Sequence, residues 1–186
     1  DQRKLISDST RAVNRLVDLT NDLLDVARLE EGRYGFEFKK RSIVPLVKQA
    51  VQKFRNAADA KGVHLVLQAA SRLPSIRVDA EKMSIALDNL IDNAIKYTHP
   101  GGNVSMRVTR DKNAVLVEIK DNGIGIPGDQ FERLFTKFFR GRNAQIFEIN
   151  GTGLGLYLTY NIIKQHGGSL TFTSKEGEGT TFLMRL

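Results

Sequence analysis

The chain has 186 residues, of which 28 are Lys or Arg and 21 are Asp or Glu, so its formal net charge is +7. With 41% hydrophobic and 26% charged residues it has the composition of a globular protein, which excludes wholesale disorder. The absence of cysteine excludes disulfides, thiolate catalysis and Cys-ligated zinc, and no apolar run is long enough to span a bilayer. The basic excess suits a ligand that carries phosphate, but an ordinary solvated surface would explain it equally well.

The first segment, residues 1–31, predicts one long amphipathic helix that ends near Gly32. Its apolar residues recur at heptad spacing and on the neighbouring lines of the same face, whereas charged residues occupy the other side. A stripe this wide needs a partner, so we expect packing in a helix bundle or a dimer; docking onto the rest of the chain is the alternative. The heptad positions are Leu5, Ala12, Leu19 and Val26.

The remainder of the chain predicts strands interleaved with helices. Alternating patterns predict strands over 36–39, 63–67, 103–110, 114–120, 169–174 and 180–186. Helical patterns cover 43–60, the segment that follows a capping Asp79, and 156–165, whereas 121–155 is rich in Gly and Phe and predicts an irregular stretch. Because strands and helices do not alternate strictly, the pattern favours an α+β sandwich with helices on one face of the sheet.

The helix after Asp79 carries polar residues between apolar neighbours. Asn89 and Asn93 are four residues apart and share a face, and Lys96 lies nearly on the same line. Amide oxygens can bind Mg²⁺ while adding little repulsion against phosphates, and a lysine can reach an anion. An ordinary solvent-facing side of the helix would carry the same residues.

Two glycine clusters flank the irregular stretch. Asp121 begins the sequence Asp-Asn-Gly-Ile-Gly-Ile-Pro directly after a predicted strand, where a carboxylate can accept from an exocyclic amine and glycines permit close approach. The second cluster, residues 151–156, opens a helix and directs backbone N–H groups towards a possible phosphate. Each cluster alone could be a plain turn, and the second is neither a Walker motif nor a dinucleotide fingerprint.

Residues 128–150, between these clusters, alternate phenylalanines with basic side chains. A stretch of this length between elements is usually functional, and a lid anchored by aromatic residues is a common form of it. A helix packed by its Phe face is the alternative. Nucleic-acid stacking is a further one, but no RNP-like or helix-turn-helix pattern accompanies these residues. The residues concerned are Phe131, Phe135, Phe138, Phe139, Arg133, Lys137, Arg140 and Arg142.

The order of these motifs resembles the ATP-binding domain of sensor histidine kinases. The Asn-rich helix, the D-N-G-I-G-I-P segment, the F-x-x-x-F segment and G-T-G-L-G-L are similar to the N, G1, F and G2 boxes of that family. The resemblance extends from about residue 36 to residue 186, and the first segment resembles the second helix of the family's dimerisation and phosphoacceptor hairpin. It implies a Bergerat-type fold, an α/β sandwich whose mixed sheet is covered by helices on one face and preceded by one bundle helix.

The resemblance also implies roles for residues on the Asn-rich helix and after the central strand. Asn93 would bind Mg²⁺ that bridges the ATP phosphates, with Asn89 beside it, while Lys96 would contact phosphate and Tyr97 the nucleotide. Asp121 would accept from the adenine amino group, and the adjacent Gly123 and Gly125 would let the base pack closely.

For the lid the resemblance implies phosphate contacts. Arg140, together with Lys137, would steady the γ-phosphate. The second glycine cluster would shape the far hinge of the lid and the phosphate pocket through Gly151, Thr152, Gly153, Leu154 and Gly155. Asn89, Lys96 and Arg140 would then be the catalytic residues.

Two departures from the family pattern affect the expected activity. Hydrolytic members of the superfamily carry a water-activating Glu where Asn89 stands, and an amide cannot take a proton, so transfer to another nucleophile is expected. The family's phosphoacceptor His is followed by Glu or Asp, but His64, His99 and His166 precede Leu, Pro and Gly. Surface or structural roles are therefore expected for all three, and the acceptor helix is expected upstream of residue 1.

The resulting expectation is an ATP-dependent protein histidine kinase in two parts, a bundle helix over 1–31 and an ATP-binding domain over 32–186. Its cofactors would be ATP and Mg²⁺, and its partners a response-regulator receiver domain and a second copy through the helix bundle, without nucleic acid. The expected location is cytoplasmic, with membrane anchoring of the full-length protein left open. The alternatives are a serine kinase of the anti-sigma type and a non-enzymatic module that binds nucleotide or nucleic acid.

Overall fold

The computed structural model describes residues 2–112, 114–148 and 151–186 and divides into two compact units, Asp1–Gly35 and Phe36–Leu186. Residues 32–35, expected with the larger domain, thus fall within the first unit. No helix in the described part of the chain combines the length and the apolar character needed to cross a membrane.

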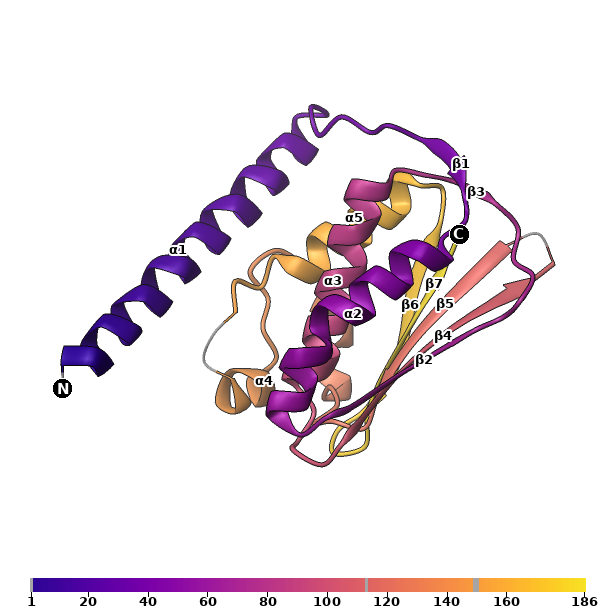
Figure 1. Ribbon diagram of the computed structural model, residues 1–186. Helices are drawn as coiled ribbons and strands as arrows, with labels where there is room; N and C mark the ends of the chain where they lie inside the picture. Colours follow the sequence, from indigo (N-terminus) through magenta and orange to yellow (C-terminus); the bar gives the residue numbers. More distant parts are fainter. Residues whose placement is uncertain (1, 113, 149–150) are drawn as a thin grey trace. The chain divides into compact units, whose positions relative to one another are not determined.

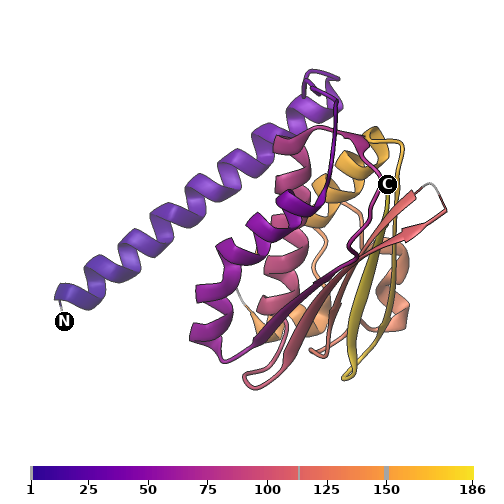
Figure 2. The same ribbon diagram turned by 45° about the vertical axis from the view of Figure 1, so that its right-hand side comes forward.

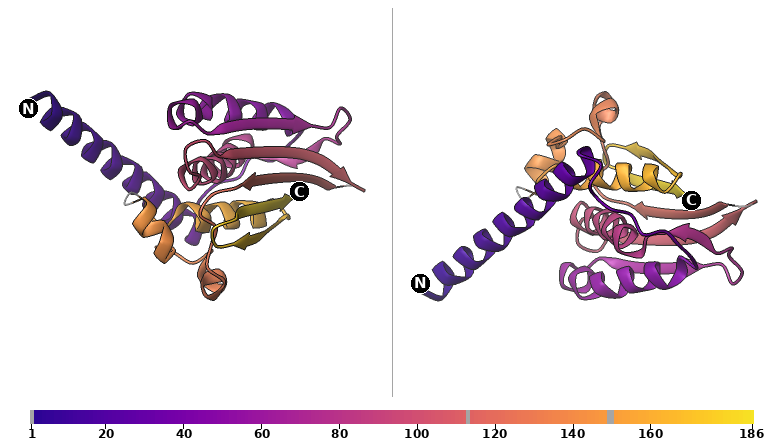
Figure 3. Two further views of the ribbon diagram at one scale, coloured as in Figure 1. Left: turned by 90° about the horizontal axis from the view of Figure 1, so that it is seen from below. Right: turned by 90° about the horizontal axis from the view of Figure 1, so that it is seen from above.

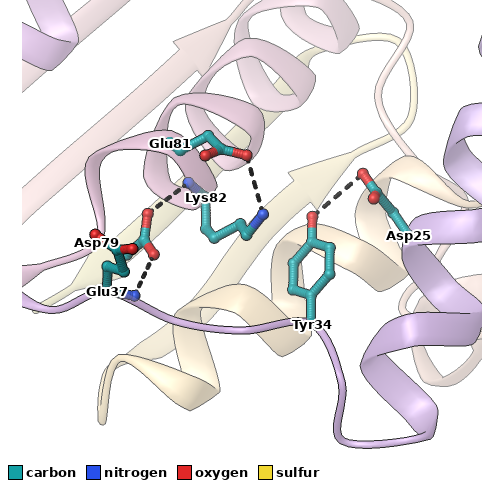
Figure 4. Close-up of polar contacts among 6 residues, drawn as sticks. All are labelled: Asp25, Tyr34, Glu37, Asp79, Glu81 and Lys82. Atoms are coloured by element: carbon teal, nitrogen blue, oxygen red, sulfur yellow. Dashed lines mark hydrogen bonds and ion pairs between the residues drawn. The ribbon is translucent and has the colours of Figure 1, made fainter.

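The first unit is built on helix α1, Gln2–Glu30 (Figure 1). The helix ends where the N–H of Gly32 donates to the carbonyl oxygen of Leu29 and that of Arg33 to Arg28. After this end, the Tyr34 hydroxyl donates to the Asp25 carboxylate at 3.3 Å (Figure 4). The expected heptad positions Leu5 and Ala12 lie outside the described side chains. Large apolar residues exposed along α1 are Ile6, Val13, Leu16, Val17, Leu19, Leu23 and Leu24.

The second unit is a sheet of five strands with helices on one face, as expected for the α+β class (Figure 1). The strands are β2 (His64–Ala69), β4 (Asn103–Asp111), β5 (Ala114–Asp121), β6 (Ser169–Lys175) and β7 (Gly179–Arg185). Their order is β2-β4-β5-β7-β6, with β2 parallel to β4 and every other pair antiparallel. Helices α2 (Val44–Lys61), α3 (Ala80–Lys96) and α5 (Gly155–Gln165) lie side by side over the sheet (Figures 2 and 3).

The core forms between these helices and the inward face of the sheet. Alternate residues of the two central strands are fully buried over 104–108 and 115–119, as the period of two requires when one face is covered. Burying side chains of this size contributes about 1.5–3 kcal/mol each. The main core residues are Met83, Leu87, Leu90, Ile91, Met106, Val117, Ile119, Leu158, Ile162 and Ile163.

The strand predicted over 36–39 is wrong, since β1 occupies Lys39–Arg41 and pairs antiparallel with β3, Ile76–Val78. The backbone N–H of Glu37 instead donates to the Asp79 carboxylate at 2.7 Å (Figure 4). The rings of Phe36 and Phe38 stack with centroids 5.5 Å apart, and both meet the edge of His166. Side-chain contacts therefore replace strand pairing before Lys39.

The stretch predicted as irregular contains two short helices. A 3₁₀ helix, η1, covers Gly128–Arg133, and α4 covers Arg142–Phe147. We call residues 126–153 the lid segment. Phe131 and Phe135 of this segment meet the edge of Phe172 on β6, so aromatic contacts anchor its first half to the sheet.

Candidate functional site

Helix α3 presents the polar residues that the sequence singles out. Its first turn is capped by Asp79, whose side chain accepts from the N–H of Lys82 at 3.0 Å (Figure 4), as predicted. Two further backbone N–H contacts lower the pKa of Asp79 despite the opposing effect of burial. Asn89, Asn93 and Lys96 are all partly exposed on a helix whose opposite side is buried.

Asn89 lies against the beginning of α5. Its Nδ2 atom donates to the carbonyl oxygen of Gly155 at 3.4 Å. A Cβ atom added at Gly155 would lie 3.3 Å from the Asn89 amide, so a glycine lets α5 begin this close to α3. The structure thus brings one residue of the Asn-rich helix next to the second glycine cluster.

The end of α3 is joined to the loop that follows β5. The N–H of Ile124 donates to the carbonyl oxygen of Tyr97 at 3.0 Å. An added Cβ at Gly123 would lie 2.1 Å from that oxygen, so no larger residue fits without moving the backbone. This contact places the first glycine cluster beside Lys96 and Tyr97.

Asp121 is the last inward-facing residue of β5, continuing the buried series of Val115, Val117 and Ile119. Its Oδ1 atom accepts from the N–H groups of Gly123 at 2.9 Å and Thr180 at 3.2 Å. Within the described residues both of these hydrogen bonds go to Oδ1, which leaves Oδ2 as the acceptor for a ligand.

Burial is also the main influence on the Asp121 carboxyl. The side chain is 8% exposed, and loss of hydration raises its pKa to about 6, although the N–H groups of Gly123 and Thr180 act in the opposite direction. When ionised, the Asp121 carboxylate is therefore poorly hydrated, so a hydrogen bond from a ligand donor to it is strong.

Gly125 determines the path of the chain into the lid segment. Its φ of +62° is in the left-handed region, and an added Cβ would lie 2.0 Å from the carbonyl oxygen of Lys175. The side-chain amide of Asn143 donates to the Gly125 carbonyl oxygen at 2.9 Å, which ties α4 to the same loop.

Two cations converge at Gly151. An added Cβ at this glycine would lie 3.5 Å from Lys96 Nζ and 3.3 Å from Arg140 Nε. Arg140 also hydrogen-bonds the Tyr97 hydroxyl and donates to the carbonyl oxygen of Glu148. Two positive side chains that meet beside a residue without a side chain form an arrangement suited to an anion.

The charges around this point perturb one another. Loss of hydration raises the pKa of Asp92, which nearby Lys96 counteracts, while Glu148 and Asp88 add to the rise. Burial likewise raises the pKa of Tyr97, and the positive charge and hydrogen bond of Arg140 oppose the rise. Clusters of mutually perturbed groups are typical of functional sites.

The far end of the lid segment passes close to its own middle. Gly153 has a φ of +71°, and an added Cβ would lie 2.6 Å from the carbonyl carbon of Phe138. Phe138 has a φ of +60°, which is unusual for a residue with a side chain, and its ring is 60% exposed. Thr152 accepts from the N–H of Leu154 at 3.2 Å, and Leu154 is fully buried.

Lys137 contacts helix α5. Its ammonium lies over the ring of Tyr157 on α5, 5.6 Å from the centroid. Arg140, which the sequence groups with Lys137, lies at Gly151 beside Lys96, and the phosphate contact of Lys137 stays a prediction. In the described part of the chain, no three His, Asp or Glu side chains form a metal cluster.

Sequence reasoning missed Lys61 at the end of α2. Its ammonium donates to the carbonyl oxygens of Ile95 at 3.0 Å and Lys96 at 2.5 Å, and it lies over the ring of Phe147 of α4, 5.2 Å from the centroid. Nothing in the local sequence points to this contact, because the partners are 34 or more residues away along the chain.

A family model described as histidine kinase-, DNA gyrase B-, and HSP90-like ATPase matches residues 78–186. The alginate biosynthesis sensor protein KinB of Pseudomonas aeruginosa is 36% identical over 183 residues, which cover 98% of this chain and 30% of KinB. The chain spans under a third of the length of the curated relatives that it matches.

Solved structures share the fold of the chain. The full-length protein ShkA in complex with AMPPNP matches 99% of this chain and 38% of its own, with a TM-score of 0.83 and 25% identity. The histidine kinase ThkA, solved in complex with the response regulator protein TrrA, matches 100% of this chain and 51% of its own, with a TM-score of 0.77 and 20% identity.

Proposed function

Because the chain belongs to the histidine kinase-, DNA gyrase B- and HSP90-like ATPase family, we propose that it is the ATP-binding catalytic part of a sensor histidine kinase. The whole protein would transfer the γ-phosphoryl group of ATP to a histidine, for relay to an aspartate of a response regulator. The observation that carries this proposal is the convergence of Lys96 and Arg140 at Gly151, next to the end of α3 that Tyr97 joins to the loop after Asp121.

Asp121 binds the adenine base. Its Oδ2 atom accepts from the exocyclic amine, while the two backbone donors to Oδ1 keep the carboxylate in place. Gly123 and Gly125 keep side chains out of the space beside the base. The ring of Tyr97 lies next to the loop that contains these glycines, and its hydroxyl forms a hydrogen bond with Arg140. The base is thereby recognised by one charged acceptor and by shape.

Lys96 and Arg140 bind the phosphates. Phosphoryl transfer requires mainly positioning and charge stabilisation, and two cations near one point supply both. The backbone from Gly151 to Gly155 leads into α5 and presents N–H groups to the anion; Thr152, Gly153 and Leu154 shape this turn. Lys137, whose ammonium lies over the ring of Tyr157 on α5, stays a predicted contact of the γ-phosphate.

The residues present fit Mg²⁺ held jointly by protein and phosphates. Asn93 offers a neutral amide oxygen on the partly exposed side of α3. The ion supplies positive charge that offsets the phosphate oxygens in the transfer. Asn89, held by its amide on Gly155, orients the start of α5 towards the phosphates.

The site favours transfer over hydrolysis. Asn89 cannot act as a general base, so water is not activated at that position. His166 uses both ring nitrogens in hydrogen bonds to backbone atoms of Asp79 and Ile162, and His99 packs edge-on against Phe147. We expect the acceptor histidine on another segment of the kinase, because none of the three histidines of this chain is followed by Glu or Asp. We propose that the reaction takes place in the cytoplasm. We also propose that the apolar side of α1 pairs with α1 of a second copy of the protein.

The first test is calorimetric titration with a non-hydrolysable ATP analogue, with and without Mg²⁺, on the 186-residue chain and on Asp121→Asn. Saturable binding that Mg²⁺ strengthens and the substitution abolishes supports the proposal; absence of binding to the unaltered chain rejects it. For the transfer, phosphate on a full-length kinase that is labile in acid and stable in alkali identifies phosphohistidine. The opposite stability would favour the serine kinase alternative.

A further inference from the structure

Lys61 stands at the meeting point of three elements, and the proposed function assigns it no role. It is the last residue of α2, and its ammonium reaches the final turn of α3 and the last residue of α4. Figures 1 and 2 show the ends of α2 and α3 next to α4. All three elements belong to the second unit.

The contact with α3 stabilises a helix end that carries two site residues. The carbonyl groups of Ile95 and Lys96 lie in the last turn of α3, where the helix dipole is negative, and that of Ile95 also accepts from the N–H of Thr98 at 3.3 Å. The Lys61 ammonium donates to both oxygens. These two hydrogen bonds hold the backbone of Lys96, whose side chain extends towards Gly151. The next residue, Tyr97, accepts from the N–H of Ile124.

The contact with α4 reaches the lid segment. The Lys61 ammonium lies 5.2 Å from the centroid of the Phe147 ring, and His99 meets the same ring edge-to-face at 4.9 Å. Phe147 directly precedes Glu148, whose carbonyl oxygen accepts from Arg140. The anchored ring therefore lies next to the residue whose carbonyl oxygen holds Arg140, the cation that meets Lys96.

The electrostatic surroundings agree with an anchored ammonium. Burial lowers the pKa of Lys61, the positive charge of Lys96 lowers it further, and the negative charges of Glu148 and Asp92 raise it. A surface lysine at a helix end would keep its hydration, whereas this one gives up part of it to contact two carbonyl groups and a ring.

We propose that Lys61 is a positioning residue of the nucleotide site: its ammonium fixes the end of α3 and holds the lid helix α4 through Phe147, so that Lys96 and Arg140 meet at the phosphates. This inference rests on the proposed function. Lys61 itself does not touch the nucleotide; it acts through Phe147 and the α3 backbone.

The test compares Lys61→Met, Lys61→Arg, Phe147→Leu and the double variant Lys61→Met/Phe147→Leu in the 186-residue chain. Lys48→Met, which changes an exposed lysine of the same helix, is the matched control. We expect Lys61→Met to weaken binding of the ATP analogue roughly tenfold. Lys61→Arg should restore most of the affinity, because a guanidinium can reach the same oxygens and ring. The double variant should bind no more weakly than Lys61→Met, because both changes break one connection.

Trypsin cleavage after Arg140 and Arg142, measured without nucleotide, reports the lid anchor independently of binding. Faster cleavage in Lys61→Met and in Phe147→Leu than in Lys48→Met supports the proposal. Unchanged cleavage, or analogue affinity within twofold of the unaltered chain, overturns it. If the unaltered chain binds no analogue, the proposed function fails by itself, and equal cleavage rates would then reject the Lys61 anchor as well.

Discussion

His166 and Asp79 form a hydrogen bond in which the backbone N–H of Asp79 donates to Nε2 of His166 at 3.1 Å. The other ring nitrogen, Nδ1, lies 2.7 Å from the carbonyl oxygen of Ile162, which can only accept. His166 is therefore the neutral tautomer with its proton on Nδ1. The bond joins the end of α5 to the cap of α3, and the Asp79 carboxylate in turn holds the N–H of Glu37.

Replacing His166 with Phe should destabilise the second unit. The ring edges against Phe36 and Phe38 can be retained, but the N–H of Asp79 loses its acceptor. We expect the free energy of unfolding to fall by about 1–3 kcal/mol, measured by urea denaturation. His64→Ala, at an exposed histidine on β2, should change it by less than about 0.5 kcal/mol. Equal effects of the two substitutions would reject a structural role for His166.

Replacing Asp121 with Asn should abolish nucleotide binding while sparing stability. The amide oxygen of Asn can accept from the N–H groups of Gly123 and Thr180, as Oδ1 of Asp121 does. The amide nitrogen Nδ2 then takes the place of Oδ2, and two donors, Nδ2 and the adenine amine, face each other. The analogue affinity is measured by calorimetry and the fold by circular dichroism. Retained affinity in the substituted protein would remove Asp121 from the base contact.

The same residue predicts how stability changes with pH. The pKa of Asp121 is about 6 in the folded protein, against 3.8 for an unperturbed aspartate, so folding favours the neutral form. Its contribution to stability is full below pH 4 and is lost as pH rises through 6, amounting to about 3 kcal/mol at most. Relative to Asp121→Asn, the unaltered chain should thus lose stability between pH 4 and pH 7, as measured by urea denaturation at each pH. A constant difference between the two proteins over this range would contradict the prediction.

Affinity for the nucleotide should follow the opposite trend. Since the adenine amine needs the ionised carboxylate, binding of the analogue at pH 5 should be roughly tenfold weaker than at pH 8. Calorimetric titrations at the two values measure this, and affinity that does not vary with pH would exclude a contact through the carboxylate.

Replacing Gly153 with Ala should disturb the lid segment more than φ strain alone explains. The added methyl group would meet the Phe138 backbone at 2.6 Å, whereas Gly167 has a similar φ of +73° and nothing within 4 Å. Gly167→Ala therefore measures the strain by itself, about 1–2 kcal/mol. We expect Gly153→Ala to reduce analogue affinity and Gly167→Ala to leave it unchanged, as measured by calorimetry. Equal affinities for the two variants would show that nucleotide binding does not depend on the close contact between Gly153 and Phe138, and would contradict the prediction.

Replacing Arg140 with Met should weaken binding of the ATP analogue by roughly tenfold to a hundredfold and binding of ADP much less, because the lost charge faces the last phosphate. Arg142→Met is the control, since the Arg142 guanidinium forms an exposed ion pair with Asp129 at 2.7 Å. The two affinities are measured by titration with each nucleotide. An equal loss for ADP and for the analogue would place Arg140 nearer the base.

The sequence predicts the long elements because their patterns are local. The buried face of α3 and its Asp79 cap follow from helical periodicity, and the alternation in β4 and β5 follows from burial on one side. The short strand β3 has only three residues, too few to show a period. The extended segment before Lys39 fails to pair because Glu37 donates to Asp79, 42 residues away, which no local pattern encodes.

The candidate site shows the same limit. Linear motifs bring out Asp121, Asn89 and the glycines, but they do not tell which cation of the lid faces Lys96. Phe138 turns the chain through a positive φ between Lys137 and Arg140, so the two side chains point to different neighbours. The role of Lys61 depends on helix-end carbonyl groups, which every helix has and which the side-chain sequence does not mark.

The two hydrogen bonds to Asp121 Oδ1 have a consequence for inhibitor design. Their donors belong to the turn after β5 and to the adjoining strand β7, at the centre of the sheet, whereas Arg140 belongs to the lid segment. A compound that imitates only the base would meet the same rigid surface whatever position the lid adopts. Substitutions in the lid segment would therefore leave the binding of such a compound unchanged, whereas they would weaken the binding of analogues that carry phosphate.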